Sequence, residues 1–125
     1  MRKRCAWGFL FVLAVVIAPL PAAAQDPVKT SPDQFKVLFE NEQVRVWSVK
    51  LDPGQKQPWH QHLLPYLIVP LTAGKNVMTF DDGRVRETNE EPGVVLWREP
   101  GIPHELQNVS DWQYRNVLVE IKVAK

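Results

Sequence analysis

Apolar residues in most of this sequence recur at every second position, in short runs that are separated by turn residues. The clearest run is Val44–Leu51, in which Trp47, Val49 and Leu51 share one face with Arg45. Side chains alternate between the two faces of an extended chain, so this pattern is typical of a β-strand with one or both faces partly covered. The run therefore predicts a strand that contributes to the core.

Further strands are predicted between strong turn signals such as Asp52-Pro53-Gly54 and Asp81-Asp82-Gly83. They cover residues 35–39, 59–62, 66–71, 76–80, 84–88, 94–97 and 114–123. Pro70 interrupts one of them, which we therefore expect at a sheet edge or at a bulge. Beyond residue 24, no stretch of ten or more residues has a helical period. Many short strands at regular spacing predict an all-β sandwich or barrel over residues 34–125.

The first 24 residues have the layout of a secretory signal peptide. Three basic residues at positions 2–4 precede the apolar run Ala6–Ala18, and an Ala-x-Ala cleavage site at Ala22–Ala24 precedes Gln25. The apolar run is shorter than the roughly 20 residues that cross a membrane. We expect cleavage, a periplasmic or secreted product and no membrane association afterwards; the alternative is an uncleaved anchor. Residues 25–33, with two prolines, are expected to form a linker or a loosely held arm.

Charge and cysteine content limit the classes of function. The one cysteine lies within residues 1–24, so cleavage leaves a domain without disulfides. Cleavage also removes three of the 15 basic residues and none of the 14 acidic ones, which changes the net charge from +1 to −2. A slightly acidic domain without a basic run is a poor candidate for binding nucleic acid. A domain of this size without disulfides depends on its core and, in one alternative, on a homodimer.

The three histidines of the chain lie in two stretches, residues 54–74 and residues 93–108, and their spacing suggests a metal site. On a strand, His60 and His62 would leave the same face about 6 to 7 Å apart, close enough to converge on one ion. A helix would separate them by about 200°, and Pro58 and Pro65 argue against a helix. His104 would join them from another part of a curled sheet. The alternative is that these histidines are ordinary polar residues near the sheet surface.

These two stretches resemble the two motifs of the cupin family. The first family motif reads Gly, five residues, His-x-His, three or four residues, Glu, six residues, Gly. Gly54, His60 and His62 fit it, whereas Tyr66 stands at the Glu position and Gly74 comes one residue late.

The second family motif reads Gly, five residues, Pro-x-Gly, two residues, His, three residues, Asn. Gly93, Gly101, His104 and Asn108 fit it, and Glu99 stands where proline is usual. The resemblance covers residues 35–123. It implies a small jelly-roll β-barrel with a metal ion inside, and dimerisation through the sheet, for which the strand at residues 35–39 is a candidate.

Tyr66 changes the ligand set that the resemblance implies, because the family commonly uses that Glu as a fourth ligand. The implied set is then three neutral imidazoles, which suit Fe, Mn, Ni, Cu or Zn and leave coordination positions open for a small molecule. Tyr66 would serve as a ligand only after losing its phenolic proton; otherwise it lines the pocket or the core, with a catalytic role as donor as its functional alternative. The resemblance implies a metalloenzyme, dioxygenase-like or isomerase-like, or a non-catalytic module that binds a small molecule or a metal.

Four further residues are candidates for substrate binding. Arg98 is expected on the same strand face as Leu96, and would clamp a carboxylate if that face lines the barrel; the alternative is a salt bridge at the rim. Trp97 would supply an aromatic wall, although packing is the simpler role for the tryptophans of this chain. Gln57 and Asn108 would hold the histidine rings by hydrogen bonds.

Overall fold

The computed structural model describes residues 26–122, and the expected signal peptide lies outside this range. The elements are α1 (Pro27–Thr30), β1 (Phe35–Glu40), β2 (Val44–Leu51), β3 (Lys56–His60), β4 (Tyr66–Pro70), β5 (Gly74–Phe80), β6 (Val85–Glu90), β7 (Leu96–Arg98), β8 (His104–Asn108) and β9 (Tyr114–Ile121). Within residues 26–122, no helix has the length and apolar character needed to span a membrane.

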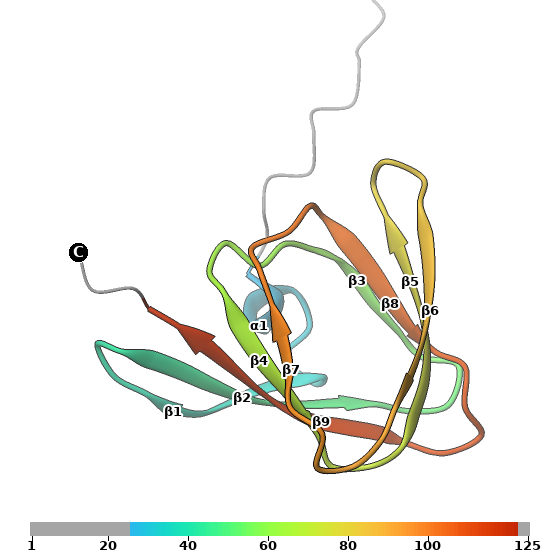
Figure 1. The fold of residues 1–125 in the computed structure, drawn as a ribbon, viewed down its shortest axis with the longest axis horizontal. Helices are drawn as coiled ribbons and strands as arrows, with labels where there is room; N and C mark the ends of the chain where they lie inside the picture. Colours follow the sequence, from blue (N-terminus) through green and yellow to red (C-terminus); the bar gives the residue numbers. More distant parts are fainter. Residues whose placement is uncertain (1–25, 123–125) are drawn as a thin grey trace, which may run out of the picture.

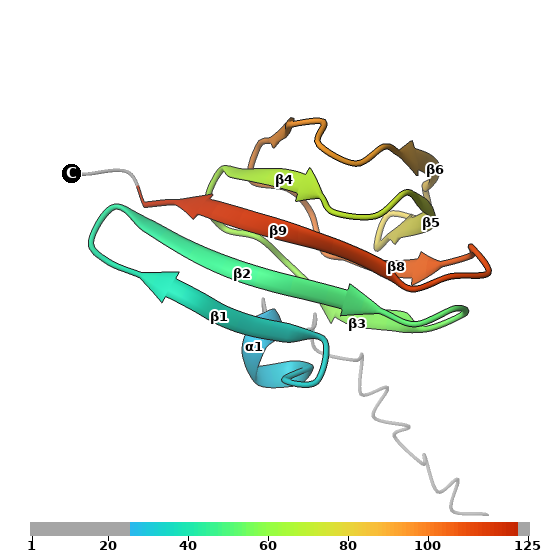
Figure 2. The same ribbon diagram turned by 90° about the horizontal axis from the view of Figure 1, so that it is seen from below.

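Two antiparallel sheets form the walls of a small jelly-roll barrel. The order is β1-β2-β9-β4-β7 in the five-stranded sheet and β3-β8-β5-β6 in the four-stranded sheet. Figure 1 shows the β5–β6 hairpin on the wall opposite β4 and β7, and Figure 2 shows β1, β2, β9 and β4 side by side. The prediction of an all-β barrel is confirmed.

The core lies between the two sheets, and the alternation of residues in β2 correctly predicts which of its side chains are buried there. Trp47, Val49 and Leu51 are 1%, 2% and 0% exposed, as their shared face predicted. Trp47 and Val49 belong to one cluster with Phe35, in which the Phe35 and Trp47 rings meet edge to face with centroids 5.8 Å apart. Burial of such large apolar side chains is the main term that stabilises a domain without disulfides.

The position of β4 differs from the prediction. Pro70 was expected to make it an edge or bulged strand, but β4 lies between β9 and β7 and pairs with β9 without a register shift. Pro70 is the last residue of β4 and lies past Ile68, where the pairing with β7 stops. Its missing N–H therefore costs no hydrogen bond on that side.

The segment before β1 is packed against the barrel instead of forming a loosely held arm. The Asp26 carboxylate accepts a hydrogen bond from the Val28 N–H at the start of α1, and it also pairs with Arg45 of β2 at 3.2 Å. Gln34 is buried, and its side-chain amide donates to the Lys56 carbonyl at 2.8 Å. Four residues of helix are too few to show a period in the sequence.

Candidate metal centre

The three histidines meet inside the barrel, although not on one strand. His60 is the last residue of β3 and stands directly opposite His104, the first residue of β8. His62 lies two residues beyond the end of β3, which corrects the prediction of a strand over residues 59–62. The ring centroids are 4.5 Å apart for His60 and His104, 5.1 Å for His60 and His62, and 5.8 Å for His62 and His104.

The donor atoms of these rings lie close enough together to make them candidate ligands of a single metal ion. One ligand atom from each ring lies within 4.8 Å of the other two, and all three residues are buried. His60 Nδ1 is 2.8 Å from the Pro58 carbonyl, and His104 Nδ1 is 3.1 Å from the Ile102 carbonyl. A carbonyl oxygen only accepts, so each Nδ1 donates its proton and leaves the Nε2 lone pair free for a metal ion.

His62 gives independent evidence that an ion or a small molecule binds at the histidine cluster. Its Nδ1 atom is buried, and within residues 26–122 it has no hydrogen-bond partner. A buried polar atom without a partner is uncommon in a folded protein and requires an explanation such as an ion or an ordered water. The residues therefore fit a divalent metal ion.

Burial keeps the three imidazoles neutral near pH 7. It lowers the pKa of His60 to about 4, and the neighbouring His104 lowers it further, while the Pro58 carbonyl acts in the opposite direction. Burial also lowers the pKa of His62 well below its ordinary value, with smaller contributions from the other two histidines. The pKa of His104 is lowered by burial as well. Neutral imidazole is the form that binds metals, so the site does not have to lose protons before it receives an ion.

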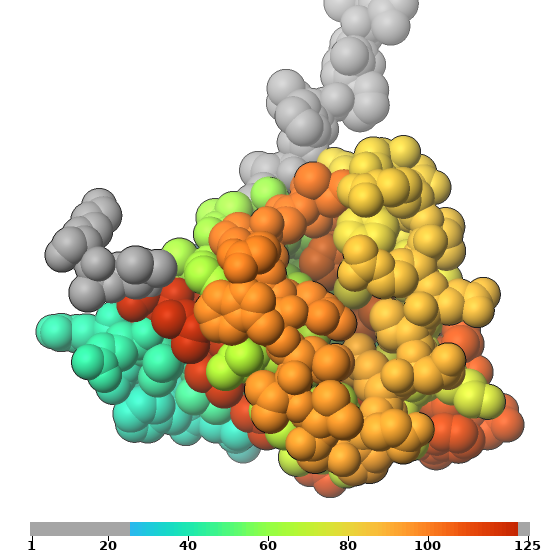
Figure 3. Space-filling model, viewed as in Figure 1, coloured from blue at the N-terminus to red at the C-terminus, as the bar shows by residue number. Residues whose placement is uncertain are grey.

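The histidines line a narrow inner cavity, and a wider outer cavity adjoins it and shares part of its lining. The inner cavity is about 40 Å³ and the outer cavity about 220 Å³; His104 and Tyr66 line both. Figure 3 shows the outer opening as a hollow between the segment that carries β7 (orange) and the β5–β6 hairpin (yellow). A small molecule in this opening would contact His104, the one member of the cluster that lines both cavities.

The protein family follows from comparison of the sequence with known families. A model described as the AraC-like ligand binding domain matches residues 51–125, which include all three histidines. The chain belongs to the AraC-like ligand binding domain family. This match and the following structures also confirm the expectation of a small cupin domain.

This AraC-like domain is similar to a known enzyme in sequence and to solved cupin structures in fold. An (R)-mandelonitrile lyase from Granulicella tundricola is 33% identical over 79 residues, covering 63% of this chain and 53% of the lyase, so the chain spans about half the length of that relative. A cupin domain from Bordetella pertussis has a TM-score of 0.67 and 31% identity, covering 71% of this chain and 92% of that one. An RmlC-like cupin from Methanocaldococcus jannaschii, with a TM-score of 0.58, 17% identity and coverage of 70% and 77%, supports the fold alone.

Tyr66 lies beside the cluster in this AraC-like domain, as the motif comparison suggested. Its ring centroid is 4.2 Å from that of His62. Burial raises the pKa of Tyr66 to about 12, against the lowering effect of Arg98 and Arg86. In the metal-free protein the phenol therefore keeps its proton at neutral pH and is available as a hydrogen-bond donor.

The four expected substrate-binding residues divide into two pairs. Arg98 and Gln57 line the inner cavity, and Arg98 also lines the outer one. Trp97 faces away: it is 48% exposed, and its indole N–H donates to the Glu99 carboxylate at 2.6 Å. The Asn108 amide is used elsewhere, because it donates to the Leu51 and Trp112 carbonyls at 3.0 and 2.8 Å.

The hydrogen-bond partners of the histidine rings also differ from the prediction. Gln57 and Asn108 were expected to hold the rings, but the backbone carbonyls of Pro58 and Ile102 accept the Nδ1 protons instead. Asn108 thus stabilises the turn after β8, where its side-chain oxygen accepts from the Ser110 N–H at 3.0 Å. Backbone partners of this kind leave no signal in residue types.

Sequence reasoning missed Arg86, a second cationic residue in both cavities. Its guanidinium carbon lies 5.3 Å from the centre of the Phe80 ring, which positions the charge beside the opening. Arg86 faces Met78 across the β5–β6 pair, so the register of the hairpin points it inward. The alternation of residues 84–88 places Arg86 on one face of the strand, but the sequence does not show which face points into the barrel.

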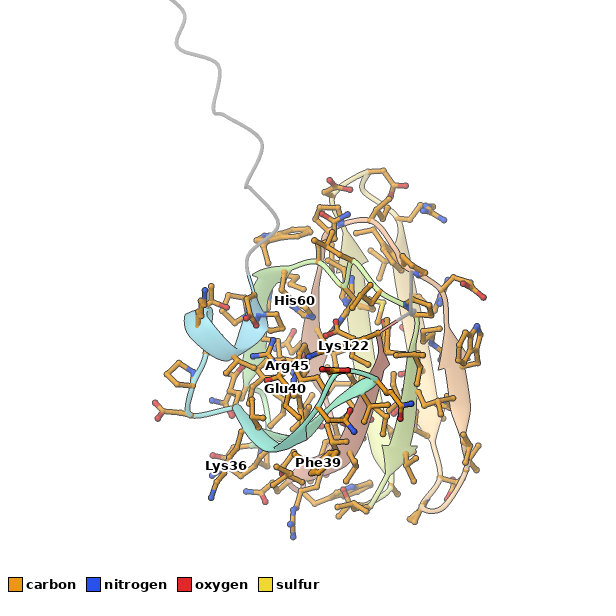
Figure 4. The ribbon with its side chains drawn as sticks, turned by 90° about the vertical axis from the view of Figure 1, so that its left-hand side faces the viewer. Lys36, Phe39, Glu40, Arg45, His60 and Lys122 are labelled. Carbon is orange, nitrogen blue, oxygen red and sulfur yellow. The ribbon has the colours of Figure 1, made fainter. Side chains whose placement is uncertain are left out.

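A separate group of charged residues, Glu40, Arg45 and Lys122, lies away from these two cavities. Glu40 pairs with Lys122 at 2.6 Å and with Arg45 at 3.5 Å, near the end of the sheet formed by β1, β2 and β9. Figure 4 shows these three side chains close together, in front of the barrel as seen from the β1 side. Arg86 and Arg98 are the arginine and lysine side chains among the residues that line the two adjoining cavities.

Proposed function

We propose that this protein is a small-molecule metalloenzyme that holds one divalent transition-metal ion with His60, His62 and His104. The observation that carries the proposal is the convergence of three buried, neutral imidazoles, with ligand atoms within 4.8 Å of one another, at the inner end of an open cavity. Three neutral nitrogen ligands suit Fe, Mn, Ni, Cu or Zn and leave coordination positions for a ligand.

The side chains around the cluster support a small substrate that carries oxygen atoms. When bound, the ion supplies Lewis-acid polarisation of such an atom and, in the case of iron, activation of dioxygen, which is the dioxygenase-like or isomerase-like chemistry that the cupin resemblance suggests. Arg98 and Arg86 would orient an anionic or carbonyl group, because guanidinium groups pair with carboxylates in a fixed geometry. Tyr66, which keeps its proton, would donate a hydrogen bond to the same group or to its reacting oxygen.

A lyase reaction is a second candidate, favoured by the 33% identity to an (R)-mandelonitrile lyase. The corresponding substrate class is an α-hydroxynitrile, whose hydroxyl oxygen would lie at the cluster. The hydroxyl would lose its proton and become a carbonyl as the bond to cyanide breaks, so that the products are an aldehyde and hydrogen cyanide. The Tyr66 phenol and the guanidinium of Arg98 are the donors that would stabilise charge on the departing group. A non-catalytic module that binds a metal or a small molecule is the alternative to both reactions.

Metal analysis tests the proposed site directly. The purified wild-type protein is expected to contain about one equivalent of ion by elemental analysis, and His60→Ala and His104→Ala are expected to lose it. Glu105→Gln is the matched control, because Glu105 follows His104 but points outward to Lys56, 2.8 Å away. Retention of a full equivalent by either histidine variant would refute the proposed ligand set.

Activity measurements separate the reaction classes. The metal-loaded protein is incubated with small diketones, thiols and flavonols while oxygen uptake is recorded, and with mandelonitrile while cyanide release is recorded. Oxygen uptake that depends on His60 supports the dioxygenase-like reaction, whereas cyanide release that depends on His60 supports the lyase. Stoichiometric metal without turnover on either panel would favour the non-catalytic module.

We also propose that the protein is exported, acts in the periplasm or outside the cell, and forms a homodimer that binds small molecules and not nucleic acid. The residues that support export are those of the expected signal peptide, and the acidic balance of the remaining chain supports the last point. Cell fractionation, with mass spectrometry of the recovered protein, tests export through a new N-terminus at Gln25. Light scattering tests the homodimer.

A further inference from the structure

The inner cavity has a second polar region in addition to the histidine cluster. Thr88 and Glu90 of β6 and Tyr114 and Asn116 of β9 line the same cavity as the histidines, and we call these four residues the cavity floor. Most buried positions in a barrel of this size are filled by apolar side chains. Four polar side chains at one end of a cavity therefore require an explanation.

Strand register places the cavity floor away from the metal centre. On β5, Phe80 pairs with His104, Met78 with Leu106, and Asn76 with Thr88. Asn76 and Phe80 are four residues apart on β5, which corresponds to about 13 Å along the strand. Thr88, beside Asn76, is therefore separated from His104, beside Phe80, by about the same distance along the sheet. Met78 and Leu106 line the cavity at the intermediate level, together with Arg86 and Gln57, which pair with them from β6 and β3.

Two polar atoms of the cavity floor lack partners. Asn116 is 4% exposed, and its side-chain oxygen Oδ1 is buried without a hydrogen-bond partner among the residues that the structure describes. Thr88 Oγ1 is in the same condition. Groups of this kind are expensive to leave unsatisfied, so an occupant of the cavity is expected to bond with them.

A chain of hydrogen bonds fixes which kind of occupant fits. The Tyr114 hydroxyl donates to the Glu90 carboxylate, and the Asn116 side-chain N–H₂ donates to the Tyr114 oxygen at 3.0 Å. The amide cannot be reversed without placing its oxygen against a hydroxyl whose proton is already used. Asn116 therefore presents an acceptor, and Glu90 adds the remaining lone pairs of its carboxylate. This end of the cavity is suited to a group that donates hydrogen bonds.

The size of the cavity limits the shape of the occupant. About 40 Å³ accommodates roughly three water molecules or the end of one slender chain, because each water requires about 10 to 15 Å³ measured in this way. A branched or aromatic group would have to remain in the outer cavity of about 220 Å³. An unbranched chain that carries a hydroxyl or amide N–H at its end matches both the width and the donor requirement.

We propose that the cavity floor is a second binding subsite, which receives the hydrogen-bond-donating end of an unbranched small molecule whose oxygen-bearing end lies at the three-histidine centre. This inference rests on the proposed function, because the metal centre is taken to hold the first end. It narrows the substrate class to linear molecules with two polar ends.

Binding of matched pairs of probes tests the subsite. Zinc-loaded protein is titrated calorimetrically with ω-hydroxyalkanoates of three to six carbons and with the alkanoates that lack the hydroxyl. At one chain length or more, the hydroxylated member is expected to bind roughly 2- to 10-fold more tightly, the range expected for one neutral hydrogen bond. Thr88→Val and Asn116→Leu are expected to abolish this preference.

The controls separate a failed subsite from a failed metal site. Thr79→Val makes the same substitution in the same sheet at a residue outside the two cavities, and it is expected to keep the preference. Thr88→Val preserves size and strand preference, so it remains informative if Asn116→Leu does not fold. One equivalent of zinc with no hydroxyl preference, or with a preference that survives Thr88→Val, overturns the subsite alone. Failure to retain zinc, or to bind either class of probe, overturns the subsite together with the metal-dependent function.

Discussion

Acid is expected to destabilise the metal-free protein through its buried histidines. Burial lowers the pKa of His60 from 6.5 to about 4 in the folded protein, whereas the unfolded chain regains a value near 6.5. Between these two values the unfolded state binds a proton that the folded state does not, so stability falls as the pH decreases from about 7 to 4. For His60 alone the loss is about 2 kcal/mol at pH 5 and about 3 kcal/mol below pH 4.

Urea unfolding, followed by circular dichroism in the presence of EDTA at pH 8 and pH 5, measures this loss. His62 and His104 add to it in the same direction, because their pKa values are also lowered. Glu120 acts in the opposite direction: burial raises the pKa of its carboxyl, so the folded state takes up that proton first. Glu120 contributes equally to the pH dependence of the wild type and of a variant that also contains it. Subtracting the stability changes of the two proteins therefore removes the contribution of Glu120.

The appropriate comparison is therefore with His60→Gln, which cannot be protonated at this position. Wild-type protein is expected to lose about 2 kcal/mol more than the variant between pH 8 and pH 5. Equal losses in the two proteins would show that His60 is not held neutral by burial, and the argument that the site is prepared for a metal ion would lose its electrostatic basis.

Three further predictions follow from packing and charge. Gly74→Ala is expected to cost about 1 to 3 kcal/mol in urea unfolding, because the new Cβ would lie 2.6 Å from Cε2 of the buried Tyr114 ring; an unchanged midpoint would contradict this. Trp47→Ala is expected to cost about 3 to 5 kcal/mol in the same assay, since the side chain is 1% exposed, and a loss below 1 kcal/mol would place Trp47 outside the core. Arg98→Met is expected to weaken binding of a short alkanoate to the zinc-loaded protein about 10-fold or more in calorimetry, whereas Trp97→Ala, on the outer face, is not; equal effects would remove Arg98 from the site.

The strands and the three-histidine cluster could be predicted from the sequence because both depend on local patterns. Alternation alone placed Trp47, Val49 and Leu51 in the core. The spacing of His60 and His62 indicated a shared target even though His62 lies beyond the strand, because a two-residue separation in extended chain preserves the direction of the side chain. Gly74, one residue late for the family motif, is explained by the Tyr114 ring that packs against it.

The cavity floor and Arg86 were not predictable in the same way. The segment Val85–Glu90 has polar residues on both of its faces, so its sequence does not show which face points into the barrel. That side is fixed by pairing with β5, where Gly74 faces Glu90 and Asn76 faces Thr88. A one-residue slip in this pairing would reverse every side chain, and a single sequence does not specify the register of a strand that is polar on both faces.

Trp47 gives the site a reporter of its own. Its indole is 1% exposed and its ring centroid lies 5.7 Å from that of His62, whereas Trp59, Trp97 and Trp112 are 38–48% exposed. A shielded indole emits at shorter wavelength than a hydrated one, and a charged imidazole or a paramagnetic ion nearby quenches it. The short-wavelength edge of the intrinsic fluorescence thus follows the state of the histidines in the unlabelled protein, with no added dye.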